Sequence, residues 1–169
     1  MAPSLEDLRN RLQQTDEDLL RAFSARAAFP RNPTPAWEGI DPRLPAPPLE
    51  ELLRAIAPAG TAEESDALTS ASCGVIDGLL ARQRMGVEIA EAKVQQHPDD
   101  YHAAIGVANR EVVLQLLTDL PTEVTRLNWI QKTAKELTPT LSANLAVLLW
   151  REHLIPWTRQ VEVDHLLVP

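Results

Sequence analysis

Cysteine and clustered histidine are scarce in this chain. Cys73 is the only cysteine, so neither an internal disulfide nor a metal site with two cysteine ligands can form. The four histidines show no HExxH or comparable ligand spacing. His97 and His102 come closest to one, but Pro98 lies between them. The sequence therefore predicts no metal site.

Positive charge and long apolar runs are also lacking. Lys and Arg total 16 against 24 Asp and Glu, a net charge of −8. This balance argues against a nucleic acid or an anionic membrane as partner, so an anionic ligand would need a local basic cluster. No apolar run approaches membrane-spanning length. The start MAPSLEDLR has no apolar core of a signal peptide. We expect a cytoplasmic protein without a membrane span, although the mature end of an exported protein would look the same.

Signals for strands, repeats and common catalytic loops are missing too. No stretch alternates convincingly between apolar and polar residues, and no period of 20–50 residues repeats. The sequence has neither a Gly-rich phosphate loop nor a GxSxG elbow. With 169 residues, of which 44% are hydrophobic, the chain can form one domain, 1–169, with a substantial core. The pattern predicts an all-α fold.

Caps and prolines divide the chain into predicted helices. Ser4 precedes an apolar helical stripe that continues to residue 27, and Thr61-Ala-Glu-Glu64 forms a capping box before the longest predicted helix, 62–96. Asp119 is a candidate N-cap for the helix that contains Pro121 in its first turn. The complete set of predicted helices is 4–27, 49–56, 62–96, two short ones after Pro98, 120–137, and 141–167 with a kink at Pro156.

The segment 28–48 carries prolines from Pro30 to Pro48 and cannot be a regular helix or a central strand. We expect an ordered connector that lies along the surface and is anchored by Trp37 and Ile40. A free linker is the alternative, because proline also stiffens linkers.

Residues 79–93, LLARQRMGVEIAEAK, place two cations on one side of a predicted helix. Arg82 and Lys93 are eleven residues apart, about three helical turns. They flank an apolar surface on which a small anion could be held at both ends. Two solvated basic residues are the alternative. Small residues at Gly74, Gly78 and Gly86 would let another helix approach closely.

Four blocks in order resemble the AroQ class of chorismate mutases, specifically the yeast and plant type. The AEAK run that follows an arginine-bearing helix is the most specific of these signals, and the ending is similar to the pattern IPxTxxVxVxxLL. The blocks are LEDLRNRLQQTDEDLLRAFSARAAFPRNP, LPAPPLEELL, IDGLLARQRMGVEIAEAKVQQHPDDYHAAI and HLIPWTRQVEVDHLL. Together they cover most of the chain.

The resemblance implies a helical bundle that converts chorismate to prephenate by an intramolecular Claisen rearrangement. That reaction needs no cofactor, metal or covalent intermediate. The enzyme must hold a flexible dianion in its compact conformer. It must also stabilise negative charge that develops on the breaking ether oxygen.

The resemblance also implies roles for individual residues. Arg9 and Arg82 match the arginines that bind the substrate carboxylates, for which a planar guanidinium is well suited. Lys93 and Glu162 match the pair that faces the ether oxygen, and Glu162 would need to be protonated there. The remaining matches are Glu123 as acceptor from the ring hydroxyl, Thr158 as a carboxylate contact, and Asp16 as an acid that orients the cations.

The chain departs from the yeast and plant type in three respects. Asp119 stands where that type has an asparagine, and its charge would oppose a dianion, so a backbone or capping role is the alternative to substrate binding. The region that carries the aromatic amino-acid effector site is shortened into the proline-rich connector, so we expect no control by tryptophan or tyrosine. The same region supplies much of the dimer contact, which leaves a monomer and a homodimer both open.

Other functions fit the same scaffold. An isochorismate pyruvate lyase needs the same grip on two carboxylates, although the ending with Thr158 and Glu162 argues against it. A non-catalytic helical binding or effector protein would have no need to keep buried charges. A regulator that senses chorismate is a further alternative, and it would show saturable binding without turnover. Each candidate site residue also has a simpler interpretation on its own, as a surface ion pair or a helix-dipole partner.

Overall fold

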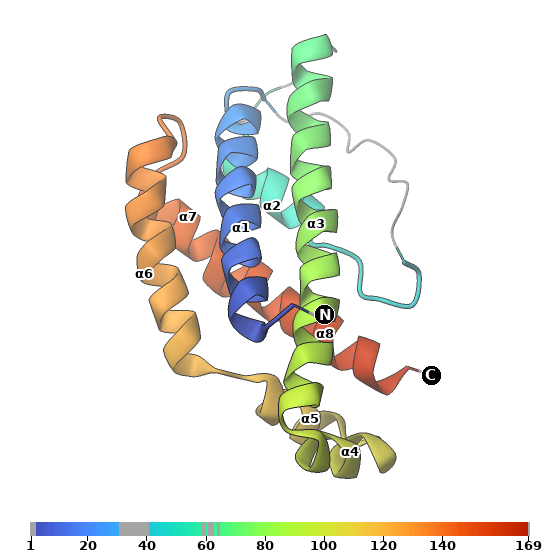
Figure 1. The fold of residues 1–169 in the computed structure, drawn as a ribbon. Helices are drawn as coiled ribbons and strands as arrows, with labels where there is room; N and C mark the ends of the chain where they lie inside the picture. The colour runs from blue at the N-terminus through green and yellow to red at the C-terminus, as the bar shows by residue number, and fades with distance from the viewer. Residues whose placement is uncertain (1–2, 31–40, 59, 61–62, 64, 169) are drawn as a thin grey trace.

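The computed structural model describes residues 3–30, 41–58, 60, 63 and 65–168, and within these ranges every regular element is a helix (Figure 1). This confirms the predicted all-α class. In chain order the elements are α1 (Leu5–Ala27), α2 (Leu49–Ile56), α3 (Asp66–Gln96), α4 (Pro98–Gly106), α5 (Arg110–Leu117), α6 (Leu120–Leu137), α7 (Ala143–Leu149), the π-helical turn η1 (Trp150–Leu154) and α8 (Ile155–Leu167).

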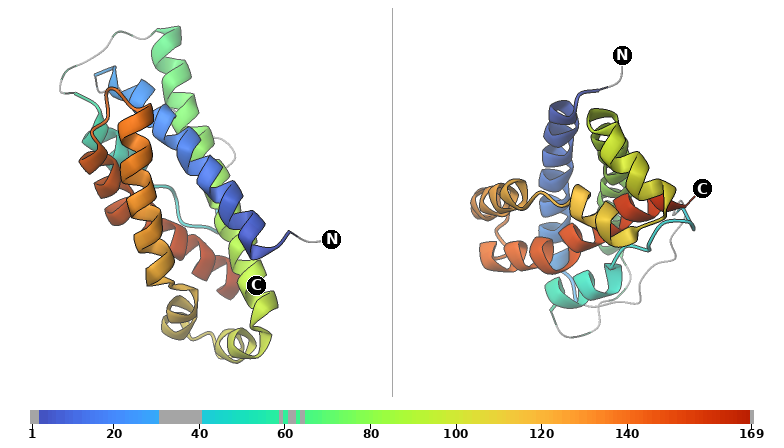
Figure 2. Two further views of the ribbon diagram at one scale, coloured as in Figure 1. Left: turned by 60° about the vertical axis from the view of Figure 1, so that its left-hand side comes forward. Right: turned by 90° about the horizontal axis from the view of Figure 1, so that it is seen from below.

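The two long helices α1 and α3 lie side by side in opposite directions and form the centre of the bundle (Figures 1 and 2). A glycine permits their close approach, because a Cβ built on Gly78 would lie 2.7 Å from Leu19 Cδ1. Helix α8 crosses α3 at Gly86, where a Cβ would lie 3.2 Å from Thr158 Cγ2. The expectation that small residues serve close helix packing is confirmed at these two positions.

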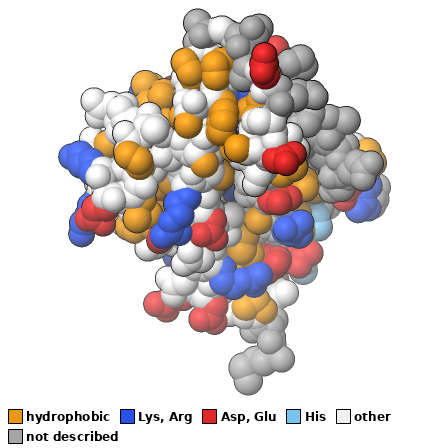
Figure 3. Space-filling model, turned by 90° about the horizontal axis from the view of Figure 1, so that it is seen from above, with side chains coloured by type: hydrophobic (Ala, Val, Ile, Leu, Met, Phe, Trp, Pro, Cys, Tyr) orange, Lys and Arg blue, Asp and Glu red, His pale blue; other side chains and the backbone are white. Residues whose placement is uncertain are grey.

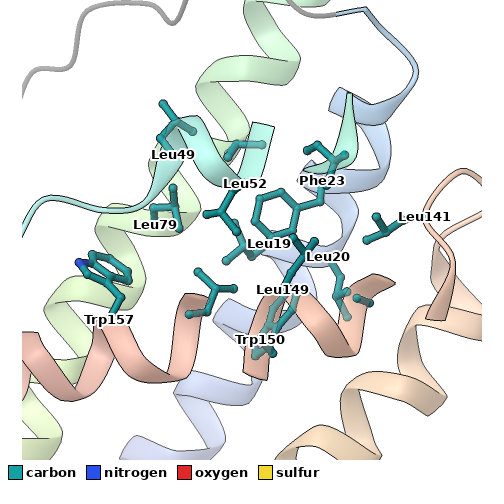
Figure 4. Packing of buried hydrophobic residues seen from close by; sticks show 14 of the residues in the cluster. Leu19, Leu20, Phe23, Leu49, Leu52, Leu79, Leu141, Leu149, Trp150 and Trp157 are labelled. Atoms are coloured by element: carbon teal, nitrogen blue, oxygen red, sulfur yellow. The ribbon is translucent and has the colours of Figure 1, made fainter. Parts of the chain in front are cut away.

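The main core lies where α1, α2, α3 and the α7–α8 segment meet (Figure 4). Leu19, Phe23 and Trp150 are fully buried there, and the rings of Phe23 and Trp150 meet edge to face with centroids 5.8 Å apart. A second cluster, around Tyr101 and Val113, joins α4 and α5 to α3 and α8. These contacts fix α8 against α3 and thereby position the side chains of the site.

Most helix boundaries follow the local signals. Ser4 caps α1 in a capping box with Asp7, and Asp119 caps α6 by accepting a hydrogen bond from the Thr122 backbone N–H. The longest helix begins later than the predicted residue 62, and Thr61, Ala62 and Glu64 of the predicted capping box fall outside the described residues. Helix α3 begins at Asp66, and Ser65 caps it by accepting from the Leu68 N–H. Leu68 is the first buried residue of this helix, so packing sets the start.

The predicted kink at Pro156 takes the form of a wider turn. Helix α7 passes into η1, in which the Ile155 N–H donates to the Trp150 carbonyl. Pro156 follows at the start of α8 and has no N–H to donate. A π turn immediately before the proline takes up the mismatch that its ring would cause in a regular α-helix.

Residues 28–30 and 41–48 of the proline-rich connector are described, and Trp37 and Ile40, the predicted anchors, fall outside the described residues. Within residues 41–48, Leu44 packs against the core and the Pro45 carbonyl accepts a 3.0 Å hydrogen bond from Trp157 Nε1. The face seen in Figure 3 carries charges of both signs among apolar side chains. No helix in the described part of the chain is long and apolar enough to cross a membrane.

Candidate active site

A cavity of about 620 Å³, part of it open to solvent, lies between α1, α3, α6 and α8, beside the α5–α6 junction. Arg82 and Lys93, the two cations of the predicted anion-binding segment 79–93, both line it from α3. Its described lining consists of Arg9, Leu12, Arg82, Ile89, Lys93, Leu117, Asp119, Thr122, Glu123, Arg126, Ile155, Thr158, Arg159 and Glu162. The cavity thus collects cations in an otherwise acidic protein.

Arg82 is held rigidly by two side chains. Its Nη1 forms an ion pair with Asp16, which is fully buried behind the cavity, and its Nε donates to Thr158 Oγ1 at 2.9 Å. Asp16 also lies 3.7 Å from Arg126 Nη1, so a single buried carboxylate serves two arginines. This arrangement fixes the guanidinium of Arg82 at the cavity wall.

Lys93 and Glu162 form a buried pair across α3 and α8. Lys93 Nζ lies 3.1 Å from Glu162 Oε2 and donates to the Leu117 carbonyl at 2.7 Å. Burial raises the pKa of Glu162, and this effect outweighs the lowering by Lys93 and, more weakly, by Arg82 and Arg159. An ammonium group and a carboxyl group with a raised pKa therefore lie next to each other in the cavity.

Arg9 and Asp119 form an ion pair nearer to solvent. Arg9 Nη2 donates to Asp119 Oδ2 at 2.9 Å, and both side chains are about 40% exposed. Asp119 is also fixed by Thr122, whose N–H and hydroxyl both donate to its carboxylate. The Thr122 hydroxyl is the main cause of a lowered pKa for Asp119, against a smaller opposing effect of burial. Asp119 is therefore both the predicted helix cap and a partner of Arg9.

Glu123 and Arg159 connect α6 to α8 across the cavity. Arg159 donates to Glu123 Oε1 through Nε at 2.9 Å and to Oε2 through Nη2, so the guanidinium engages both carboxylate oxygens. Thr158, beside Arg159 in the sequence, donates to the Leu154 carbonyl at 2.7 Å and accepts from Arg82. Both residues have defined orientations before any ligand binds.

The structure brings most of the predicted site residues to this cavity. Seven of them line it: Arg9, Arg82, Lys93, Asp119, Glu123, Thr158 and Glu162. Asp16 does not line it but lies behind Arg82. Sequence analysis missed Arg126 and Arg159 as members of the site. Their spacing offered a signal, since Arg126 follows Glu123 by three residues and Arg159 precedes Glu162 by three, which places each pair on one helix face.

The described residues contain no group of three His, Cys, Asp or Glu side chains arranged to hold a metal ion. The side chains that dominate the cavity are instead guanidinium, ammonium and carboxyl groups. They are suited to binding carboxylates and to hydrogen bonding at an oxygen atom.

Comparison with known proteins gives a consistent family of relatives. A curated relative, chorismate mutase 2 of Arabidopsis thaliana, is 30% identical over 119 residues, 61% of this chain. The chain spans 44% of the length of that relative. No protein-family model matches the sequence.

Solved structures resemble nearly the whole chain. The chloroplast chorismate mutase from Zea mays superposes with a TM-score of 0.82 at 18% identity, covering 97% of this chain and 94% of that one. Aro7p chorismate mutase from Candida albicans, in complex with L-Trp, gives a TM-score of 0.75 at 17% identity, covering 97% and 90%.

The fold is therefore the all-helical fold of the plant and yeast chorismate mutases. In sequence, too, the chain is similar to a curated chorismate mutase over 119 residues. The resemblance expected from the four sequence blocks is confirmed.

Proposed function

We propose that the chain catalyses the rearrangement of chorismate to prephenate in the cavity between α1, α3, α6 and α8. One observation carries the proposal: Arg9 and Arg82 approach this cavity from two helices, while Lys93 and Glu162 meet inside it. A substrate with two carboxylates and a breaking ether bond needs this combination. Homology to chorismate mutases supports the same activity.

In this proposal the arginines select the reactive conformer. Arg82, whose orientation is fixed by Asp16 and Thr158, binds one carboxylate, and Arg9 binds the other. Holding both carboxylates keeps the enolpyruvyl side chain folded over the ring, so that the carbon atoms that form the new bond stay close. Glu123, oriented by Arg159, accepts from the ring hydroxyl.

Lys93 and Glu162 act on the ether oxygen. As the C–O bond breaks, negative charge grows on that oxygen, and Lys93 donates a hydrogen bond to it. Glu162 donates a second one when its carboxyl group carries a proton, a state that burial favours. An ionised Glu162 would instead repel both the oxygen and the dianionic substrate.

We also propose how the whole chain is organised and regulated. The chain works as a single domain, 1–169, in which one copy provides the lining of the cavity, so catalysis does not depend on whether it is a monomer or a homodimer. The segment 28–48 stands in place of a regulatory region, and tryptophan and tyrosine have no effect on the rate. A cytoplasmic location remains our expectation from the sequence.

The test is to incubate the purified chain with chorismate and, separately, with isochorismate, and to identify the products by chromatography. Prephenate from chorismate, at a rate unaffected by tryptophan or tyrosine, is the expected result. Release of pyruvate from isochorismate without prephenate formation would identify a lyase. Saturable binding of chorismate without turnover would identify a binding protein and overturn the proposal.

A further inference from the structure

The five cations that line the cavity all have acidic partners within the protein. The pairs are Arg9–Asp119, Arg82–Asp16, Arg126–Asp16, Lys93–Glu162 and Arg159–Glu123. A dianionic ligand must therefore take at least one cation from a carboxylate that already holds it, or share that cation. The ion pair that separates most readily is the one whose cation becomes available to the substrate.

The pairs differ in how firmly they are held. Asp16 is fully buried and Glu162 nearly so, and a charge left behind there would have no water to compensate it. Glu123 is bound by both nitrogens of a guanidinium fork. The Arg9–Asp119 pair is joined by one hydrogen bond, from Arg9 Nη2 to Asp119 Oδ2, and both partners are about 40% exposed. Such exposed pairs contribute little net free energy.

Within this pair, Arg9 is the partner free to move. Asp119 is held by the N–H and hydroxyl of Thr122, at 3.0 and 2.7 Å, as the cap of α6. Its lowered pKa keeps it ionised. Arg9 projects from α1 on a long side chain whose Nη2 atom makes the contact. An exchange of partners therefore moves the guanidinium and leaves the carboxylate in place.

We infer that Asp119 competes with the substrate for Arg9, so that substrate affinity is limited by the transfer of Arg9 from Asp119 to a substrate carboxylate. This rests on the proposed function for the identity of the substrate. Asp119 is paired with the guanidinium that a substrate carboxylate would need. After the transfer, Asp119 keeps its two hydrogen bonds from Thr122 but loses its ion pair with Arg9.

The variant Asp119→Asn tests this inference without disturbing the helix. Asparagine caps a helix as well as aspartate does and can still accept from the Thr122 N–H. We expect KM for chorismate to fall about three- to tenfold, with the change in KM rather than in kcat and with an unchanged thermal unfolding midpoint. An unchanged or higher KM would overturn the inference.

Two controls isolate the role of Arg9. Asp164→Asn makes the same change in net charge and also removes an acid from an arginine pair, with Arg110, but Asp164 does not line the cavity. It should leave KM as in the wild type. In an Arg9→Ala background, Asp119→Asn should lose most of its effect, because the partner for which it competes is gone. A full effect in that background would contradict the competition.

The inference can fail separately from the proposed function. Turnover of chorismate by the wild type tests the function, whereas the comparison between variants tests the competition. If the wild type binds chorismate without turnover, the same variants are compared by calorimetric titration with chorismate. Tighter binding by Asp119→Asn supports the inference, and equal or weaker binding overturns it.

Discussion

Buried charge has the largest effects at the scale of single residues. Asp16, Arg82, Lys93 and Glu162 lie in or behind one cavity with little contact with water. Removing such groups from water costs several kcal/mol each before pairing returns part of it. A protein without use for them would be as stable with apolar side chains at these positions, so their presence supports a site for an anionic ligand.

Glu162 sets the expected pH dependence. Its protonated form is the active one in the proposed mechanism, and burial raises its pKa above the ordinary range of a glutamate. We expect kcat/KM to be highest at acidic pH and to fall as pH rises through this raised pKa, because ionisation removes a donor and adds repulsion. Glu162→Gln should flatten the profile, since a neutral amide still donates. A wild-type rate independent of pH would exclude the protonated role.

Asp16 should be important for stability. Asp16→Asn keeps the shape of the side chain but leaves Arg82 and Arg126 without their shared buried counterion. We expect the free energy of unfolding to fall by about 3 kcal/mol, as measured by urea denaturation. Asp18→Asn is the control on the same helix, because Asp18 is exposed and pairs only on the surface. A loss below about 1 kcal/mol for Asp16→Asn would contradict a buried ion pair.

At the scale of elements, alanine substitutions at two glycines of α3 allow the effect of close helix packing on stability to be measured apart from the effect of helix propensity. A Cβ on Gly74 would lie 3.6 Å from Ala22 Cβ, an ordinary contact, whereas one on Gly78 would lie 2.7 Å from Leu19 Cδ1 inside the core. Gly74→Ala should therefore stabilise the fold by up to about 1 kcal/mol. Gly78→Ala should be at least about 1 kcal/mol less stable than Gly74→Ala, since Leu19 must move.

Thermal and urea unfolding of both glycine variants measure this difference. Equal stabilisation by the two alanines would show that α1 and α3 are not packed as closely as Gly78 indicates. The comparison cancels the common gain in helix propensity, because both positions lie within the same helix.

Local chemistry predicts most of the elements, and packing decides the rest. Ser4, Asp119 and the prolines mark helix ends that the structure confirms. Helix α3 begins at a cap, Ser65, that the sequence did not single out, and its buried face begins at Leu68. The turn at Trp150–Leu154 follows from Pro156, but its π form depends on how α7 and α8 pack.

Only those residues of the site that a family pattern or helix spacing indicates could be predicted from the sequence. Spacing places Arg82 and Lys93 on one face of α3, and the resemblance supplies the other positions. Neither indicates that Arg159 engages Glu123 or that Arg9 pairs with Asp119, since these contacts join helices far apart in sequence. Arg126 has no place in the resemblance, and its spacing from Glu123 does not reveal its contact with Asp16.

At the scale of the whole molecule, the fold explains how an acidic protein can bind a dianion. The net charge of −8 is spread over the chain, while five cations converge on one cavity. Helices α1, α3 and α8, whose arrangement is seen in Figure 1, contribute to its wall. Glu162 of α8 lies opposite Lys93 of α3. A local cluster of cations of this kind is what an anionic ligand would need in an acidic protein.

The most direct test of the account is the rate of prephenate formation by the wild type and by Lys93→Ala, purified in parallel. Lys93 donates into the cavity from α3, and loss of one such donor costs at least about 10²-fold in kcat. The account predicts saturable conversion of chorismate by the wild type and a loss of that size in the variant, with both proteins folded. Equal rates, or a loss below about tenfold, would show that the reaction does not take place in this cavity.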